Sequence, residues 1–130
     1  MNFNKTIPEL SVFDINKSKN FYLNVLGAKI EYERQEDKFV FLFLEENQLM
    51  LEEIHDNGWN IGELTYPLGQ GINISLEIKN VDSIYQRVKE HNITLYRDMK
   101  ISHYTGANEI IKQKEFLLQD PNGYLLRLTN

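Results

Sequence analysis

The chain has 130 residues, of which 42% are hydrophobic and 25% are charged, a composition typical of one globular domain. Its 19 acidic residues outnumber the 14 basic ones, and the net charge of −5 repels nucleic acids and attracts cationic ligands. Cysteine is absent, which excludes disulfides and thiolate metal sites and favours the cytoplasm, and no apolar run approaches the roughly 20 residues of a membrane helix.

The first half of the chain predicts a strand, a helix and three more strands, in that order. Asp14 has the side chain of a helix N-cap, and Gly27 is the residue type that ends a helix at its C′ position. Polar turns at 35–38 and 45–47 separate the later strands. We expect the strands at 7–13, 29–34, 39–44 and 48–54 and the helix at 16–26.

A long connection leads into the second half. Residues 55–71 hold four of the seven glycines and the only tryptophan, Trp59, which indicates a loop between two halves. An amphipathic helix then begins near residue 81, with Asn80 or Asp82 as its N-cap.

Strands occupy most of the chain after this helix. Residues 100–112 are ambiguous, and they predict an irregular strand broken at Gly106. The segment Asp-Pro-Asn-Gly at 120–123 predicts a tight turn between the last two strands. We expect the strands of this half at 72–78, 93–98, 116–119 and 124–129.

Both halves thus have the same order of elements, a strand, a helix and three strands. Such a repeat predicts a single α+β domain built from two βαβββ modules with pseudo-twofold symmetry, whose curved mixed sheets surround a cleft. We place the first module at 1–54, the connecting loop at 55–70 and the second module at 71–130.

Short segments spread over nearly the whole chain carry a family resemblance. They are 14–18 (DINKS), 21–22 (FY), 25–27 (VLG), 33–34 (ER), Phe39, 48–52 (QLMLE), 59–62 (WNIG), 81–82 (VD), 95–96 (LY) and 115–124 (EFLLQDPNGY). With these segments the chain resembles the vicinal-oxygen-chelate superfamily of glyoxalases, ring-cleaving dioxygenases, fosfomycin-modifying enzymes and bleomycin-resistance proteins. The resemblance is strongest to the bleomycin-resistance branch, and it leaves function open because the fold hosts both enzymes and pure binders.

The resemblance also identifies where a metal would be held. Metal-dependent members of the superfamily take two ligands from each module, and the matching positions here are Ile7, Glu52, Asn73 and Arg127. Ile7 has no donor atom, and Arg127 cannot deprotonate and would repel a cation. Only Glu52 is a competent ligand, with Asn73 a weak neutral one, so we expect no metal and no cofactor at this position.

The three histidines have no metal-binding spacing in the sequence. His91 is expected to complement the C-terminus of the second helix. His55 and His103 are expected to be surface histidines, although they could meet in space and join Glu52 in a non-standard ligand set.

Strand alternation predicts one polar and one apolar face for each sheet. The cleft-facing set is Ile7, Glu9, Ser11, Met50, Glu52, Ile54, Asn73, Ser75, Glu77, Leu125, Arg127 and Thr129. The set expected to pack under the helices is Leu10, Val12, Leu49, Leu51, Ile72, Ile74, Leu76, Leu126 and Leu128. Glu52 and Arg127 occupy repeat-related positions and could form an ion pair, and the polar face suits water or a dimer partner as well as a ligand.

These observations favour a metal-free binding protein of the bleomycin-resistance type, which sequesters a cationic, aromatic small molecule in a dimer cleft without altering it. The resemblance matches Phe39 to a stacking phenylalanine of that branch, whereas Lys112 stands where the second stacking aromatic is expected. Trp59, Tyr66 or Tyr104 could take over that part. The candidate ligand-binding residues are Phe39, Met50, Glu52, Trp59, Asn73, Tyr104 and Arg127.

Two alternatives remain open at this stage. The first is a metal-dependent glyoxalase-like or dioxygenase-like enzyme whose metal is held by Glu52 with His55 or His103. The second is an interaction protein whose cleft is vestigial. In each case we expect a homodimer, because two such modules leave sheet edges and polar faces to cover, and we expect neither a nucleic-acid nor a membrane partner.

Overall fold

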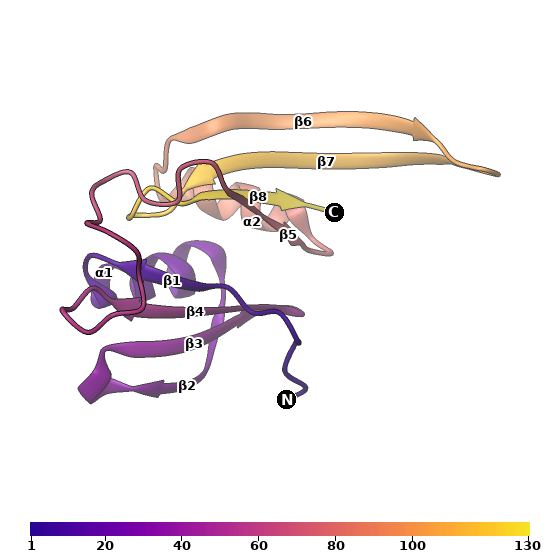
Figure 1. Ribbon diagram of the computed structural model, residues 1–130. Helices are drawn as coiled ribbons and strands as arrows, with labels where there is room; N and C mark the ends of the chain where they lie inside the picture. Colours follow the sequence, from indigo (N-terminus) through magenta and orange to yellow (C-terminus); the bar gives the residue numbers. More distant parts are fainter.

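The computed structural model describes residues 1–130 as two βαβββ units, each with a four-stranded mixed sheet (Figure 1). The first unit contains β1 (Glu9–Val12), α1 (Ile15–Asn20), η1 (Phe21–Leu26), β2 (Lys29–Arg34), η2 (Gln35–Asp37), β3 (Phe39–Leu44) and β4 (Asn47–Glu53). The second contains β5 (Asn73–Glu77), α2 (Val81–Glu90), β6 (Leu95–Thr105), β7 (Ile110–Gln119) and β8 (Leu125–Thr129). The strand orders are β1-β4-β3-β2 and β5-β8-β7-β6, with a parallel β1–β4 and β5–β8 pair, so the expected fold class is confirmed.

The helices begin and end where the sequence predicts. Asp14 caps α1, because its Oδ1 atom accepts the backbone N–H groups of Asn16 and Lys17 at 3.0 and 3.1 Å. After Asn20 the helix widens into the π-helical η1, and Gly27 ends it in the left-handed conformation with φ of 83°. Asn80 rather than Asp82 caps α2, by accepting the N–H of Ser83. None of the helices is both long and apolar enough to cross a membrane.

The hairpin β6–β7 breaks at Gly106, as the sequence predicts, but its strands are regular where an irregular strand at 100–112 was expected. The two strands pair continuously from Lys100–Glu115 to Thr105–Ile110, and Gly106 lies in the turn, where its N–H donates to the carbonyl of Glu109. Only the part of β7 from Glu115 onward pairs with β8, so the outer part of the hairpin extends beyond the sheet (Figure 1). Neither face of this extension packs on the core, which is why its sequence lacks a clear strand pattern.

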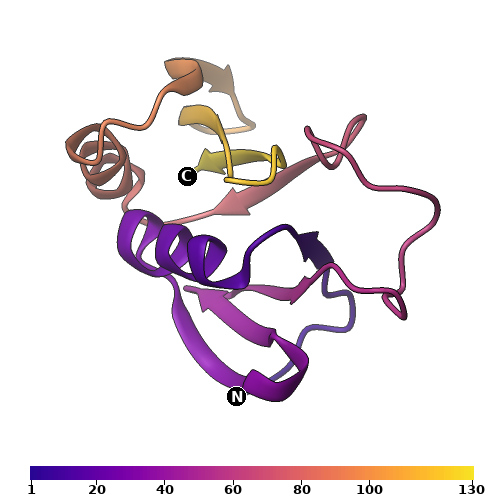
Figure 2. The same ribbon diagram turned by 90° about the vertical axis from the view of Figure 1, so that its left-hand side faces the viewer.

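The apolar faces of both sheets share one hydrophobic core with the helices. Figure 2 shows the helix formed by α1 and η1 between the two sheets. The residues expected to pack under the helices are buried, except that Ile74 is half-buried and Ile72 is 64% exposed. The expectation for Ile72 is wrong because β5 begins one residue later, and Ile72 belongs to the turn that precedes it.

A buried polar network joins the turn before β8 to the first unit. Asp120 accepts the hydroxyl of Tyr22 at 2.8 Å and the backbone N–H groups of Asn122 and Tyr124 at 2.8 and 3.0 Å. The Tyr124 hydroxyl in turn donates to the carbonyl of Ser11 in β1 at 2.9 Å. These bonds hold the Asp-Pro-Asn-Gly turn against the first helix and the first strand.

Because the apolar faces meet at a common core, the polar faces of the two sheets lie on the outside. Glu9 in β1 and Asn73 and Glu77 in β5 are exposed, as the alternation predicts. Within one chain, therefore, the two polar faces do not close around a shared cleft. Each sheet presents its own outer surface, and a hollow lies on each of them.

Candidate functional site

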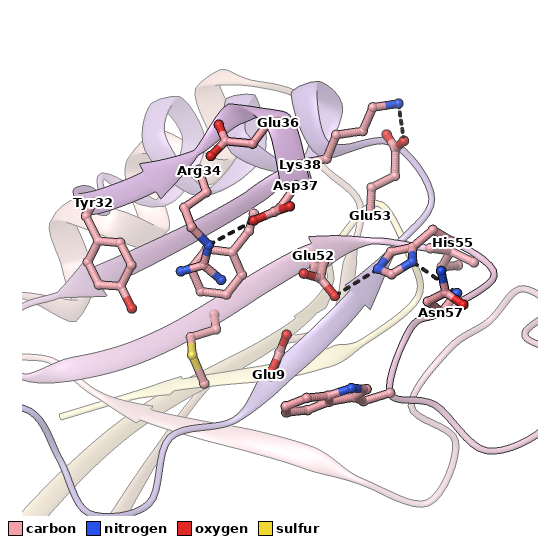
Figure 3. Close-up of a pocket in the computed structure, with 14 residues that line it drawn as sticks. Glu9, Tyr32, Arg34, Glu36, Asp37, Lys38, Glu52, Glu53, His55 and Asn57 are labelled. Atoms are coloured by element: carbon pink, nitrogen blue, oxygen red, sulfur yellow. Dashed lines mark hydrogen bonds and ion pairs between the residues drawn. The ribbon is translucent and has the colours of Figure 1, made fainter.

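A hollow of about 760 Å³ lies on the outer face of the first sheet (Figure 3). Its floor comes from β1, β2, β3 and β4, and its rim comes from η2 and from the connection after β4. The residues that line it are Glu9, Tyr32, Arg34, Glu36, Asp37, Lys38, Phe39, Met50, Glu52, Glu53, Ile54, His55, Asn57 and Trp59.

Strand register explains why the central side chains of this hollow are neighbours. Arg34 pairs with Phe39 across β2 and β3, and Phe39 pairs with Glu52 across β3 and β4. Directly paired residues project on the same face of a sheet. An arginine, a phenylalanine and a glutamate thus form a row across three strands, with Glu9 of β1 opposite Met50 in the next row.

The aromatic floor is covered by the protein itself. The Arg34 guanidinium carbon lies 4.0 Å from the centre of the Phe39 ring, and Tyr32 is tilted against the same ring at 5.9 Å. Phe39 is therefore only 4% exposed, although it faces the hollow and not the core. The Nε atom of Arg34 donates to Asp37 Oδ2 at 3.1 Å, and this ion pair is open to solvent.

Negative charge dominates the hollow. The lining has the five carboxylates of Glu9, Glu36, Asp37, Glu52 and Glu53 against two permanent cations and one histidine. Burial raises the pKa of Glu9 above its ordinary value of 4.5, the nearby charge of Glu52 raises it further, and the charge of Arg34 opposes both. Glu53 is neutralised locally, since Lys38 donates to it at 2.8 Å and lowers its pKa. Glu9 and Glu52 on the floor and Glu36 on the rim therefore have no lysine or arginine as an ion-pair partner.

The predicted site residues fall into two groups. Phe39, Met50, Glu52 and Trp59 come together in the hollow. Trp59 stands at its edge and is 96% exposed.

Asn73, Tyr104 and Arg127 belong to the second sheet, and a single chain does not bring them to the hollow. Asn73 and Tyr104 are exposed, while Arg127 is half-buried. The ion pair that Glu52 and Arg127 could form is absent within the chain, because the two residues lie on the outer faces of different sheets. Glu52 contacts His55 instead. Arg127 takes part in no ion pair, and its Nε atom is buried without a hydrogen-bond partner.

The histidines do not assemble with other ligand types into a metal centre. His55 Nε2 lies 3.2 Å from Glu52 Oε2, which makes a pair, whereas His103 is in β6 of the other sheet. His91 Nδ1 lies 2.9 Å from the carbonyl of Arg87 at the end of α2, the position expected for it. No group of three or more His, Asp or Glu side chains is close enough together to hold a metal ion.

Sequence reasoning missed the part played by β2. Tyr32, Arg34 and Asp37 shape the hollow, but none was a candidate ligand-binding residue. Alternation along β2 would have placed Tyr32 and Arg34 on one face, and the hairpin connection to β3 would have set them beside Phe39. The contact of Arg34 with the ring itself has no sequence signal.

Comparisons with known proteins identify the family. A bleomycin resistance protein from Geobacillus stearothermophilus is 27% identical over 130 residues, which covers 94% of this chain and 92% of that protein. A lactoylglutathione lyase from Salmonella typhimurium is also 27% identical, over 122 residues covering 92% of this chain and 86% of that protein. The crystal structure of TioX from Micromonospora sp. ML1 has the same fold, with a TM-score of 0.75 at 12% identity and 98% coverage of both chains. The profile of the Glyoxalase/Bleomycin resistance protein/Dioxygenase superfamily matches residues 6–128, and the chain belongs to this superfamily.

Proposed function

We propose that the protein is a metal-free binding protein of the bleomycin-resistance type, which sequesters a cationic, aromatic small molecule without chemistry. The observation that carries the proposal is the hollow of the first sheet, which combines an aromatic floor with carboxylates that have no lysine or arginine partner. A cation over an aromatic face gains from the ring quadrupole, and nearby carboxylates strengthen the attraction. The similarity to bleomycin resistance proteins over most of the chain supports the same function. A cytoplasmic location is part of the proposal.

The chemistry of the four superfamily ligand positions supports binding over catalysis. Ile7 offers no donor atom, and Arg127 brings a positive charge to a position that would have to hold a cation. Glu52 is the one competent ligand of the four, and Asn73 is a weak neutral one. This donor set does not fit a metal ion, so we derive no metal-dependent step.

A second copy of the chain is part of the same proposal. The outer part of the β6–β7 hairpin exposes Ile101, Tyr104, Ile110 and Ile111. The register places Ile101 and Ile110 on one face of the hairpin and Tyr104 and Ile111 on the other. A two-stranded hairpin is marginally stable alone in water, and apolar side chains exposed on both of its faces favour contact with another chain. This extension is also basic: Lys100 and Lys112 stand against the single acid Glu109, while Lys114 is paired with Asp82 of the same chain, and this charge suits the acidic hollow of another chain.

The second copy would also unite the two groups of predicted site residues. A dimer that sets the outer face of the second sheet over the hollow would bring Asn73, Tyr104 and Arg127 toward Phe39 and Glu52. Arg127, whose buried Nε lacks a partner, would then face carboxylates across the dimer. We therefore propose a homodimer with a binding cleft lined by both chains.

The binding proposal is tested by calorimetric titration with copper-free bleomycin. We expect saturable binding by the wild-type protein and binding about tenfold weaker for Trp59→Ala, which removes an aromatic wall. Ile61→Ala is the matched control, because Ile61 is fully exposed on the same connection and does not line the hollow. Absence of saturable binding, or equal weakening in both variants, would contradict the proposal.

Light scattering tests the dimer. The wild-type protein should have twice the mass of one chain at micromolar concentration. Ile110→Glu, which places an acid on the exposed hairpin, should be a monomer, and Ile61→Glu should remain a dimer. A monomeric wild-type protein would contradict the shared cleft.

One observation keeps an enzyme as the second candidate. The lactoylglutathione lyase has the same 27% identity to this chain as the bleomycin resistance protein, over 122 rather than 130 residues, and the Glu52–His55 pair could supply two metal ligands. Elemental analysis of protein purified without chelators distinguishes the two functions. Stoichiometric metal that is lost in His55→Ala would favour the enzyme.

A further inference from the structure

The Arg34 side chain occupies a place in the hollow where an aromatic ring and carboxylates converge. Its guanidinium lies 4.0 Å from the centre of the Phe39 ring and leaves that ring 4% exposed. A guanidinium is planar and weakly hydrated, so it stacks on an aromatic face where a compact ammonium group would keep its water. The position therefore already holds a planar cation, and that cation belongs to the chain.

The surroundings of this position are complementary to positive charge on more than one side. Asp37 accepts Arg34 Nε at 3.1 Å, and Glu52 pairs with Phe39 in the neighbouring strand. Glu9 lies within range of the Arg34 charge, which lowers its pKa against the effects of burial and of Glu52. Two carboxylates on the floor and one on the rim thus surround a flat aromatic surface.

The interactions that hold the Arg34 side chain in this place are weak. The side chains of Arg34 and Asp37 are 46% and 54% exposed, and exposed ion pairs of this kind contribute little stability. No other hydrogen bond fixes the guanidinium. Arg34 is also the last residue of β2, so its side chain can turn toward the solvent without disturbing the sheet.

We propose that Phe39, Glu9, Glu52 and Asp37 form a subsite for a planar cation, such as an amidinium or guanidinium group of a ligand, and that Arg34 is a displaceable occupant which the ligand must remove. This inference rests on the proposed binding function and specifies which chemical group is recognised and which residue competes for its place. Displacement of Arg34 lowers the net affinity of any ligand that takes this place, and the Phe39 ring favours a flat cation over a compact ammonium group.

Calorimetric titration with benzamidine, a planar aromatic amidinium, tests the subsite. Arg34→Ala should bind benzamidine about tenfold more tightly than the wild-type protein, because the competing cation is gone. Lys38→Ala is the matched control, since it also removes one positive charge from the lining of the hollow but does not touch Phe39. The affinity of Lys38→Ala for benzamidine should rise clearly less than that of Arg34→Ala. Benzylamine has the same charge on a tetrahedral ammonium group. Its affinity should rise less in Arg34→Ala than the affinity of benzamidine does.

A measurement on the wild-type protein tests the subsite even if Arg34→Ala does not fold. Benzamidine should shift the NMR signal of the Arg34 Nε–H and the ring signals of Phe39 together, in one saturable process. The proposed subsite would be overturned if Arg34→Ala and Lys38→Ala gained equal affinity for benzamidine. It would also be overturned if the Arg34 signal did not move at saturation.

These outcomes are separable from those of the bleomycin titration. Bleomycin binding without any Arg34 effect refutes the subsite and leaves sequestration standing. Benzamidine binding with the expected Arg34 effect, but no binding of bleomycin, supports the subsite and refutes bleomycin as the ligand.

Discussion

Removal of the Tyr22 hydroxyl should destabilise the protein by about 2 kcal/mol, because a hydrogen bond to a buried charged group contributes roughly 1.5–3 kcal/mol. Tyr22 is 1% exposed, and its hydroxyl donates to Asp120 at 2.8 Å. Tyr22→Phe keeps the ring, which packs edge-on against Phe21, so no cavity term adds to the loss. Asp120 would keep its bonds from Asn122 and Tyr124, which limits the effect.

The pH dependence of the loss depends on the charge state of Asp120. Burial raises the pKa of Asp120 above its ordinary value of 3.8, although the bonds from Tyr22 and Asn122 pull the pKa down. A carboxyl group whose pKa is raised in the folded state loses stability as pH rises through that pKa. Tyr22→Phe removes one of the bonds that favour ionisation, so its destabilisation should be large at neutral pH and shrink at acid pH.

Urea unfolding at one protein concentration, repeated between neutral and acid pH, measures this loss. Tyr85→Phe is the matched control, because the Tyr85 hydroxyl also donates to a carboxylate, that of Asp98, but on the exposed surface. The loss in free energy of unfolding should be much smaller in Tyr85→Phe than in Tyr22→Phe. Equal losses for the two variants, or a loss in Tyr22→Phe that is constant with pH, would refute the reasoning.

Three further predictions concern the first helix, the core and the hollow. Asp14→Ala removes the N-cap acceptor of two backbone N–H groups and should cost about 1 kcal/mol in urea unfolding, and an unchanged midpoint would contradict the capping role. Leu128→Ala empties a fully buried position of β8 and should cost about 2–5 kcal/mol, whereas a loss below that range would mean that the core closes over the gap. The affinity for benzamidine should fall as pH drops through the raised pKa of Glu9, and Glu9→Gln should bind more weakly at neutral pH and lose that dependence. The same pH profile in Glu9→Gln and in the wild-type protein would assign the dependence to another group.

Local sequence rules predicted most of the fold because the determining groups are neighbours in the chain. Asp14 and Gly27 bound the first helix through their own backbone contacts, and both were identified. Strand alternation separated Leu126 and Leu128 from Arg127, because one face of β8 must be buried. The Asp-Pro-Asn-Gly turn was likewise recognised from residues that bond within four positions of one another.

The remaining features depend on contacts that no local pattern encodes. The outer β6–β7 hairpin is held by pairing alone, without a buried face, so its residues show no periodicity toward a core. Phe39 lines the hollow, but its coverage by Arg34 depends on a side-chain rotamer. Glu52 and Arg127 occupy equivalent positions in the repeat, yet they lie on separate outer faces, because the two sheets share their apolar sides and not their polar ones.

Sheet register also explains why the acidic, aromatic surface of the hollow does not depend on the other three superfamily ligand positions. The cross-strand row of Arg34, Phe39 and Glu52 depends only on how β2, β3 and β4 pair. An acidic, aromatic surface therefore persists whatever residues stand at the other superfamily ligand positions.

The proposed function requires that a cationic ligand is held without metal and without chemical change. The most direct test is calorimetric titration of chelator-treated protein with copper-free bleomycin, followed by mass analysis of the recovered ligand. We expect saturable binding at one or two sites per dimer, an affinity unaffected by chelator, and a ligand of unchanged mass. Binding that appears only after metal is added, or a ligand recovered with altered mass, would contradict metal-free sequestration.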